Sequence, residues 1–288
     1  MMIVVGKADV GKTTFARRLY QELAADSGPV AFLDGDPGQS TLGPPCTMTV
    51  AVGGAKDGDF PPRSGTWSYF VGATSPRGHM LQILTGAARL VAVAREAGAG
   101  RIVYDTTGLI DRAQGGLTLK LAKIDLLRPD TVFALQEDGE LEPLLSPLRR
   151  TKRVRVVDVS PSPARRPRDA EARRAHRARK FAQYFGGAHL HQVGWNDFPV
   201  LPQVSFQPGR LLSLEDIRGL VLGLAIVEEV DNRARKALLL TPLSSHDLAQ
   251  VDALRLGEVR IDPQTFEDRA LLPPWLDAGW QRGNPSRR

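Results

Sequence analysis

The chain has 288 residues, of which 42% are hydrophobic and 24% charged, and its formal net charge is +6. This composition excludes a mainly disordered, fibrous or membrane protein, and the length fits one large domain or a main domain with a smaller partner. The single cysteine, Cys46, cannot form an internal disulfide, and the longest apolar stretch, residues 219–227, is far short of the roughly 20 residues that span a bilayer. With no visible secretion signal, we expect a cytoplasmic protein that has no membrane partner.

Short apolar and β-branched runs alternate with helical patterns through the first two thirds of the chain. The predicted strands are residues 2–5, 30–33, 102–104, 131–135 and 154–159. The predicted helices are residues 13–25, 80–97 and 117–127. This alternation predicts the α/β class, with a parallel sheet and helices on both faces. After Gly187 the pattern becomes rich in proline, and residues 220–228, 237–240 and 256–261 are predicted strands of a small second unit.

The strongest motif is Gly-Lys-Ala-Asp-Val-Gly-Lys-Thr at residues 6–13, the GxxxxGK[ST] pattern between a predicted strand and a predicted helix. Such a loop turns its backbone N–H groups toward phosphate oxygens, and the helix N-terminus adds partial positive charge. Lys12 is expected to reach the β- and γ-phosphates, and the Thr13 hydroxyl to ligate Mg²⁺. The predicted nucleoside triphosphate site comprises Gly6, Asp9, Val10, Gly11, Lys12, Thr13 and Thr14.

Two aspartates follow the second predicted strand, in Asp-Gly-Asp-Pro-Gly-Gln at residues 34–39. In open α/β sheets ligands bind at the carboxyl ends of strands, so a carboxylate here could accept a proton from a hydroxyl or hold a metal-bound water. The alternative is a turn that the aspartates only cap, since Asp-Pro-Gly is ordinary turn chemistry. The convergence of both aspartates and Gln39 on one strand end favours a functional site.

The strand at residues 102–104 ends in Asp105, followed by Thr-Thr-Gly. An apolar strand that ends in Asp is the Walker B arrangement, in which the carboxylate contacts the Mg²⁺ shell. The Thr-Thr-Gly segment can bring hydroxyls and a backbone N–H to phosphate. The alternative is an aspartate that caps the next segment.

Positive charge is concentrated in residues 149–180, which hold thirteen basic and three acidic residues, a local charge of +10 against −4 for the rest. Within it, residues 168–185 are predicted to form a helix with Arg173, Arg174, Arg177 and Lys180 on one face. Such a helix could be a lid that supplies arginine to a transferred phosphoryl group. The alternatives are a solvated helix and one that only grips a polynucleotide backbone.

Taken together, these motifs resemble those of the polynucleotide 5′-hydroxyl kinases, a P-loop family of tRNA splicing, mRNA 3′-end formation and pre-rRNA processing. The resemblance runs from residue 3 to about residue 262. The segments that carry it are Asp-Val-Gly-Lys at 9–12, Asp-Gly-Asp-Pro-Gly-Gln at 34–39, Pro-Pro-Cys-Thr at 44–47, the Thr-Ser-Pro loop at 70–78, the clasp at 105–110, the lid at 173–186 and residues 240–243 and 256–259.

The resemblance implies that the γ-phosphate of ATP, or of another nucleoside triphosphate, is transferred with Mg²⁺ to the 5′-hydroxyl end of RNA or DNA. It implies catalytic roles for Lys12, Asp36, Arg174 and Arg177, with Asp36 activating the hydroxyl. Thr106 and Gly108 of the clasp would restrain the γ-phosphate. The implied metal ligands are Thr13, Asp36, Gln39 and Asp105. The implied substrate-binding residues are Gln39, Thr74, Ser75, Arg77 and Arg173.

We expect a P-loop kinase domain at 1–198 with an arginine-rich lid at about 165–186, a small β-rich domain at 199–272 and an irregular tail at 273–288. One alternative function is a nucleotide-binding scaffold of RNA processing with little transfer activity, but a scaffold has no need of Asp36 beside the phosphates. Another is a small-molecule kinase, which would not require a local charge of +10. The sequence names no protein partner.

Overall fold

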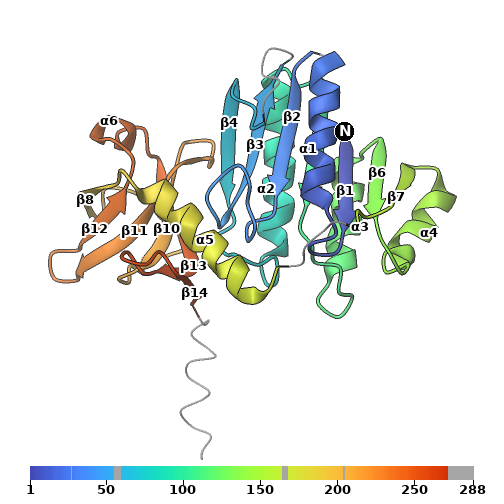
Figure 1. Cartoon of the computed structure of the whole chain (residues 1–288). Helices are drawn as coiled ribbons and strands as arrows, with labels where there is room; N and C mark the ends of the chain where they lie inside the picture. Colours follow the sequence, from blue (N-terminus) through green and yellow to red (C-terminus); the bar gives the residue numbers. More distant parts are fainter. Residues whose placement is uncertain (27, 55–59, 164–167, 204, 272–288) are drawn as a thin grey trace, which may run out of the picture.

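The computed structural model describes residues 1–26, 28–54, 60–163, 168–203 and 205–271, which form two sheets and the helices around them (Figure 1). The predicted tail at 273–288 lies outside these residues. The first sheet contains β1 (Met2–Gly6), β2 (Val30–Gly35), β3 (Thr47–Gly53), β4 (Gly65–Phe70), β5 (Arg101–Thr106), β6 (Thr131–Leu135) and β7 (Arg155–Val159). The helices are α1 (Lys12–Asp26), α2 (Met80–Glu96), α3 (Gly116–Leu127), α4 (Glu142–Thr151), α5 (Ala170–Phe185) and the short α6 (Ser245–Leu248).

The strand order in the first sheet is β4-β3-β2-β5-β1-β6-β7. The pairs among β2, β5, β1, β6 and β7 are parallel, which confirms the predicted α/β class. At one edge of the sheet, β3 pairs antiparallel with β2 and β4 pairs antiparallel with β3, which the sequence analysis did not predict. The sheet is therefore mixed, with parallel pairing from β2 to the β7 edge and antiparallel pairing at the β4 edge.

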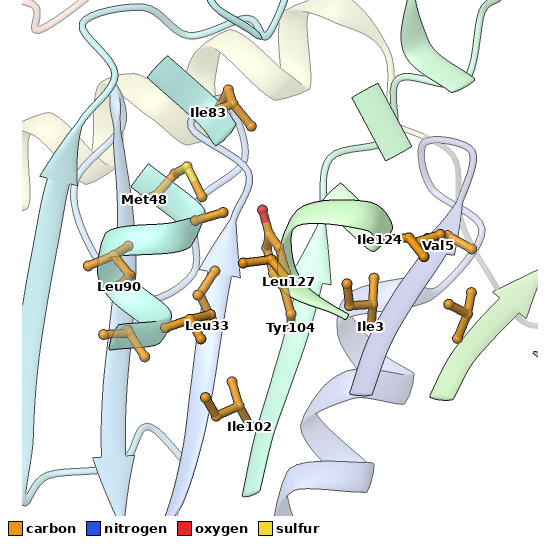
Figure 2. Packing of buried hydrophobic residues seen from close by; sticks show 14 of the residues in the cluster. Ile3, Val5, Leu33, Met48, Ile83, Leu90, Ile102, Tyr104, Ile124 and Leu127 are labelled. Atoms are coloured by element: carbon orange, nitrogen blue, oxygen red, sulfur yellow. The ribbon is translucent and has the colours of Figure 1, made fainter. Parts of the chain in front are cut away.

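Helices cover both faces of this sheet. Val4, Phe32 and Val103 pack on α1 at one face. On the opposite face, side chains of α2, α3 and α4 join a second apolar cluster, part of which Figure 2 shows. Because both faces are buried, the central strands are almost entirely apolar, as is typical of parallel sheets.

The loops that follow β1, β2 and β5 emerge at one edge of the sheet, because these strands are parallel neighbours. Asp34 lies in register with Asp105, and Val4 of β1 lies in register with the same Asp105 from the other side. The three predicted functional segments thus converge at the carboxyl ends of the central strands, the lower edge of the sheet in Figure 1.

The second sheet follows α5 in the chain and is built from β8 (His189–Gly194), β9 (Val200–Leu201), β10 (Arg210–Glu215), β11 (Val221–Asp231), β12 (Lys236–Thr241), β13 (Ala253–Ile261) and β14 (Asp268–Ala270). Phe181 and Phe185 of α5 pack on one face of it, together with Phe70 from the first sheet. Its β8 strand pairs with β12, so the sheet begins before residue 198. The domain boundary at residues 198/199 stays a prediction.

Within the described ranges, no helix has both the length and the apolar character to span a bilayer.

Candidate functional site

The P-loop runs from the end of β1 to the first turn of α1. Its conformation requires a glycine at position 11, where φ is +99°, in the region that side chains disfavour. Val10 anchors the loop in the apolar cluster beneath α1, where it is almost fully buried. The chain thus carries a strand, a phosphate-binding loop and a helix N-terminus in the predicted order.

The ammonium of Lys12 lies inside this loop and donates to the Lys7 carbonyl at 2.7 Å. Only 7% of the residue is exposed. Burial lowers the pKa of Lys12, although the carboxylates of Asp105, Asp36 and Asp9 oppose this effect. A cation held among carboxylates and main-chain amides is suited to bind a polyphosphate.

Asp34 and Asp36 have different surroundings, although they lie two residues apart. Asp34 is buried, and its Oδ2 accepts from the N–H groups of Thr41 and Leu42, so it holds the loop after β2 in place. Asp36 lines the cleft beside the P-loop. Its Oδ1 accepts from the N–H groups of Gly38 at 2.9 Å and of Gln39 at 3.0 Å, which fixes the carboxylate in orientation.

Asp105 and Thr13 meet at the base of the cleft, where the Thr13 hydroxyl donates to Asp105 Oδ2 at 2.5 Å. The other carboxylate oxygen, Oδ1, is buried and has no hydrogen-bond partner among the described residues. Burial raises the pKa of Asp105 to about 7, against the opposing effects of Lys12 and the Thr13 hydrogen bond. A buried carboxylate oxygen without a donor, next to a hydroxyl, is a suitable pair of ligands for a hard cation.

The clasp closes the cleft from the side of β5. The Thr106 hydroxyl donates to the Val4 carbonyl at 2.7 Å, so the first clasp residues are tied to β1. Gly108 lies directly against the P-loop, and a Cβ atom at this position would be 2.7 Å from Ala8 Cα. Only glycine permits this approach of the two backbones.

The N-terminal end of α5 contacts the P-loop through Asp9. Arg173 donates to Asp9 Oδ2 at 2.5 Å, and Arg168 lies 3.5 Å from Oδ1. Partial burial raises the pKa of Asp9, but the hydrogen bonds from Arg173 and Arg168 outweigh it and leave the pKa lowered. Both arginines line the cleft, so the first turn of α5 and the residues just before it bring two cations to it.

The structure does not bring the two predicted catalytic arginines to the cleft. Arg177 donates to Asp268 of β14 at 2.8 Å in a largely buried ion pair. Arg174 is exposed and does not line the cleft. The physical reason is that α5 passes from the first sheet to the second, so arginines one turn apart meet different elements. In this conformation Arg168 and Arg173 line the cleft instead.

The cleft has a volume of about 230 Å³. It is lined by Ala8, Asp9, Gly11, Lys12, Thr13, Thr14, Asp36, Gln39, Thr106, Gly108, Arg168 and Arg173. A larger cavity of about 590 Å³ lies between α3 and α4, but it is lined by residues such as Ile124 and Leu148 and contains none of the predicted site residues.

Of the five predicted substrate-binding residues, two line the cleft and three do not. Gln39 and Arg173 line the cleft, and the Gln39 side chain donates to the Gly38 carbonyl at 2.7 Å. Thr74, Ser75 and Arg77 do not line it, but their loop lies beside it, because a Cβ at Gly38 would be 2.3 Å from the Thr74 carbonyl oxygen.

Two features of the site were missed in the sequence. Arg168 was placed at the start of the predicted arginine-rich helix but was not named as a site residue. Lys120 of α3 was not singled out either, although it is 1% exposed and donates to Thr106 and Thr107 of the clasp. Its helix neighbour Lys123 is equally buried but has no hydrogen-bond partner among the described residues. A signal was available in the sequence, because both lysines fall on the same three- and four-residue spacing as the buried apolar residues of a mostly apolar helix, where a buried charge is unexpected.

Comparison with known proteins agrees with this geometry. Residues 6–187 match a family model described as the mRNA cleavage and polyadenylation factor CLP1 P-loop. A polyribonucleotide 5′-hydroxyl-kinase of Methanocaldococcus jannaschii is 27% identical over 94% of this chain and 89% of its own length. A protein of the same description from Pyrococcus furiosus is 25% identical over 90% and 87%. Among solved structures, Clp1p in a Clp1p–Pcf11p complex superposes with a TM-score of 0.67 at 16% identity, over 90% of this chain and 74% of that chain, which shows a shared fold.

Proposed function

Because the chain belongs to the CLP1 P-loop family, we propose that it transfers the γ-phosphate of ATP to the 5′-hydroxyl end of RNA or DNA. The names of its archaeal relatives, polyribonucleotide 5′-hydroxyl-kinases, support this assignment. The observation that carries the proposal is the position of Asp36. Its carboxylate lines the same cleft as Lys12, so a base faces the place where a P-loop holds the γ-phosphate.

In the proposed reaction the 5′-hydroxyl oxygen forms a bond to the γ-phosphorus, and the bond from that phosphorus to the β–γ bridging oxygen breaks. Asp36 accepts the hydroxyl proton, and ADP leaves. Lys12 balances charge on the transferred phosphoryl group and on the leaving oxygen. Since phosphoryl transfer depends mainly on positioning and charge, the two main-chain hydrogen bonds that orient Asp36 matter as much as its basicity.

Thr13 and Asp105 would hold Mg²⁺, and the unpartnered Oδ1 of Asp105 fits this role. The side-chain oxygen of Gln39, also buried without a hydrogen-bond partner among the described residues, is a further candidate ligand, and Asp36 borders the same space. When bound, the metal would neutralise charge on the β- and γ-phosphates.

Arg168 and Arg173 are the proposed cations of the lid. Their present partner is Asp9 of the P-loop, so they already lie at the mouth of the phosphate site. We assign to them the charge stabilisation that the sequence resemblance gave to Arg174 and Arg177.

The incoming polynucleotide is proposed to contact the loop of Thr74, Ser75 and Arg77, which lies beside the Asp36 loop. The remaining positive charge of residues 149–180 would attract its phosphates. A cytoplasmic location fits a chain whose one cysteine, Cys46, is buried and unpaired.

The test is transfer of label from γ-labelled ATP to a 5′-hydroxyl oligonucleotide. Lys12→Ala and Asp36→Asn are expected to reduce kcat/KM by about 100-fold or more. Asp125→Asn, on the exposed side of α3, is the matched control and should transfer like the unaltered protein. If the unaltered protein binds ATP but no label enters the oligonucleotide, the chain is a nucleotide-binding scaffold instead.

A further inference from the structure

Lys120 lies in the middle of α3, on the side that faces the sheet. Only 1% of the residue is exposed, and Leu117 and Ile124 are buried on the same side of the helix. A buried amine is costly to desolvate and is retained only when its hydrogen bonds are satisfied or when it has a function.

Among the described residues, the hydrogen bonds of the Lys120 ammonium are all with the clasp. Its Nζ donates to the Thr107 carbonyl at 2.8 Å and to the Thr106 hydroxyl at 3.2 Å. Since the Thr106 hydroxyl in turn donates to Val4 of β1, a chain of hydrogen bonds joins α3, the clasp and the strand that precedes the P-loop. Lys120 therefore holds the first residues of the clasp in place through these two hydrogen bonds.

The bond to the Thr107 carbonyl also fixes the next amide. In a trans peptide the carbonyl and the following N–H point in opposite directions. Because the Thr107 carbonyl points into the protein toward Lys120, the Gly108 N–H points away from it. Gly108 lines the nucleotide cleft, and its N–H has no acceptor within the part of the chain that the structure describes.

Lys123, one turn further along α3, provides an internal comparison. It is equally buried, but its Nζ has no hydrogen-bond partner among the described residues and lies 4.8 Å from the centre of the Tyr104 ring. Both lysines are buried on the same helix, but among the described residues only Lys120 forms hydrogen bonds with the clasp.

We propose that Lys120 is a positioning residue of the kinase site, which holds the peptide between Thr107 and Gly108 so that the Gly108 N–H faces the γ-phosphate of the bound nucleotide. This inference rests on the proposed function, since it assigns the γ-phosphate to this cleft. Lys120 itself does not contact the nucleotide. It acts through the orientation of one amide.

The experiment compares ATP with ADP, because only ATP carries the γ-phosphate. Lys120→Met keeps the length and apolar stem of the side chain and removes both hydrogen bonds. By calorimetry this variant should bind ATP about 10-fold or more weakly, the loss expected for one donor to a charged group, and should bind ADP within about twofold of the unaltered protein. Its kcat for transfer should fall at least as much.

Lys123→Met is the matched control and should leave both affinities and kcat within about twofold. Lys120→Gln retains an N–H donor, so it should fold and show a smaller, ATP-selective loss even if Lys120→Met does not fold. An equal loss of ATP and ADP binding, no loss of either, or the same loss in Lys123→Met would overturn the proposal. Because nucleotide binding is measured without an oligonucleotide, absence of transfer to polynucleotides would refute the proposed function and leave this test intact.

Discussion

Replacement of Gly108 by alanine tests the contact between the clasp and the P-loop. The added Cβ would lie 2.7 Å from both the Cα and the N of Ala8, and these backbone atoms cannot rotate away. Ordinary contacts between carbon atoms are about 3.5–4.0 Å, so the two segments must separate by about 1 Å. A displacement of about 1 Å at a phosphoryl-transfer site costs roughly 100-fold in rate, or about 2.7 kcal/mol of barrier.

The measurement is kcat/KM for label transfer from γ-labelled ATP, together with the midpoint of urea unfolding. Gly100→Ala is the control, because Gly100 is exposed and its Cβ would meet nothing within 4 Å. We expect Gly108→Ala to lose about 100-fold in kcat/KM with the fold retained, and Gly100→Ala to lose nothing. Transfer by Gly108→Ala within threefold of the unaltered protein would show that the clasp is not positioned by this contact.

Three further predictions concern charge. Arg173→Ala should reduce transfer about 100-fold. Arg177→Ala should preserve transfer but lower the free energy of unfolding by about 3 kcal/mol, because Asp268 loses its ion-pair partner. Equal effects of the two substitutions on transfer would contradict this division. Burial raises the pKa of Asp105 to about 7, and a protonated carboxyl group does not bind Mg²⁺. The Mg²⁺ concentration for half-maximal transfer should therefore rise about tenfold for each pH unit below 7 and become constant above pH 7. In Asp105→Asn, the Mg²⁺ concentration for half-maximal residual transfer should not show this pH dependence. Burial lowers the pKa of Lys123 to about 7 from an unfolded value of 10.5. Below pH 7 the buried charge therefore destabilises the folded protein by roughly 4–5 kcal/mol, and this destabilisation disappears as the pH rises toward 10.5. Urea unfolding should therefore show Lys123→Met stabilised most at pH 6 and progressively less up to pH 10, and a constant difference would be inconsistent with a shifted lysine.

The parts of the site that the sequence predicted are those set by local chain geometry. The motif at residues 6–13 predicts a phosphate-binding loop between a strand and a helix, and the structure has β1 before this loop and α1 after it. The convergence of Asp36 and Asp105 followed from the rule that parallel strands present their carboxyl ends at one edge.

The contacts that were not predicted depend on packing between distant elements. Helical spacing places Arg173 and Arg177 on one face of α5, but it does not reveal that the face meets the P-loop at one residue and β14 one turn later. Lys120 was missed for a related reason, since a lysine in an apolar helix acquires a role only through the clasp that folds over it. The antiparallel strands β3 and β4 lack the alternation with helices on which the strand predictions relied.

The most direct test of the account is the mass of the product formed from a 5′-hydroxyl oligonucleotide with ATP and Mg²⁺. We expect the oligonucleotide to gain one phosphate at its 5′ end, with one ADP released per phosphate, and the same oligonucleotide already carrying a 5′-phosphate to remain unchanged. Hydrolysis of ATP without any gain in oligonucleotide mass, or a phosphate gained elsewhere than at the 5′ end, would contradict the assignment of Asp36 as the base for a 5′-hydroxyl.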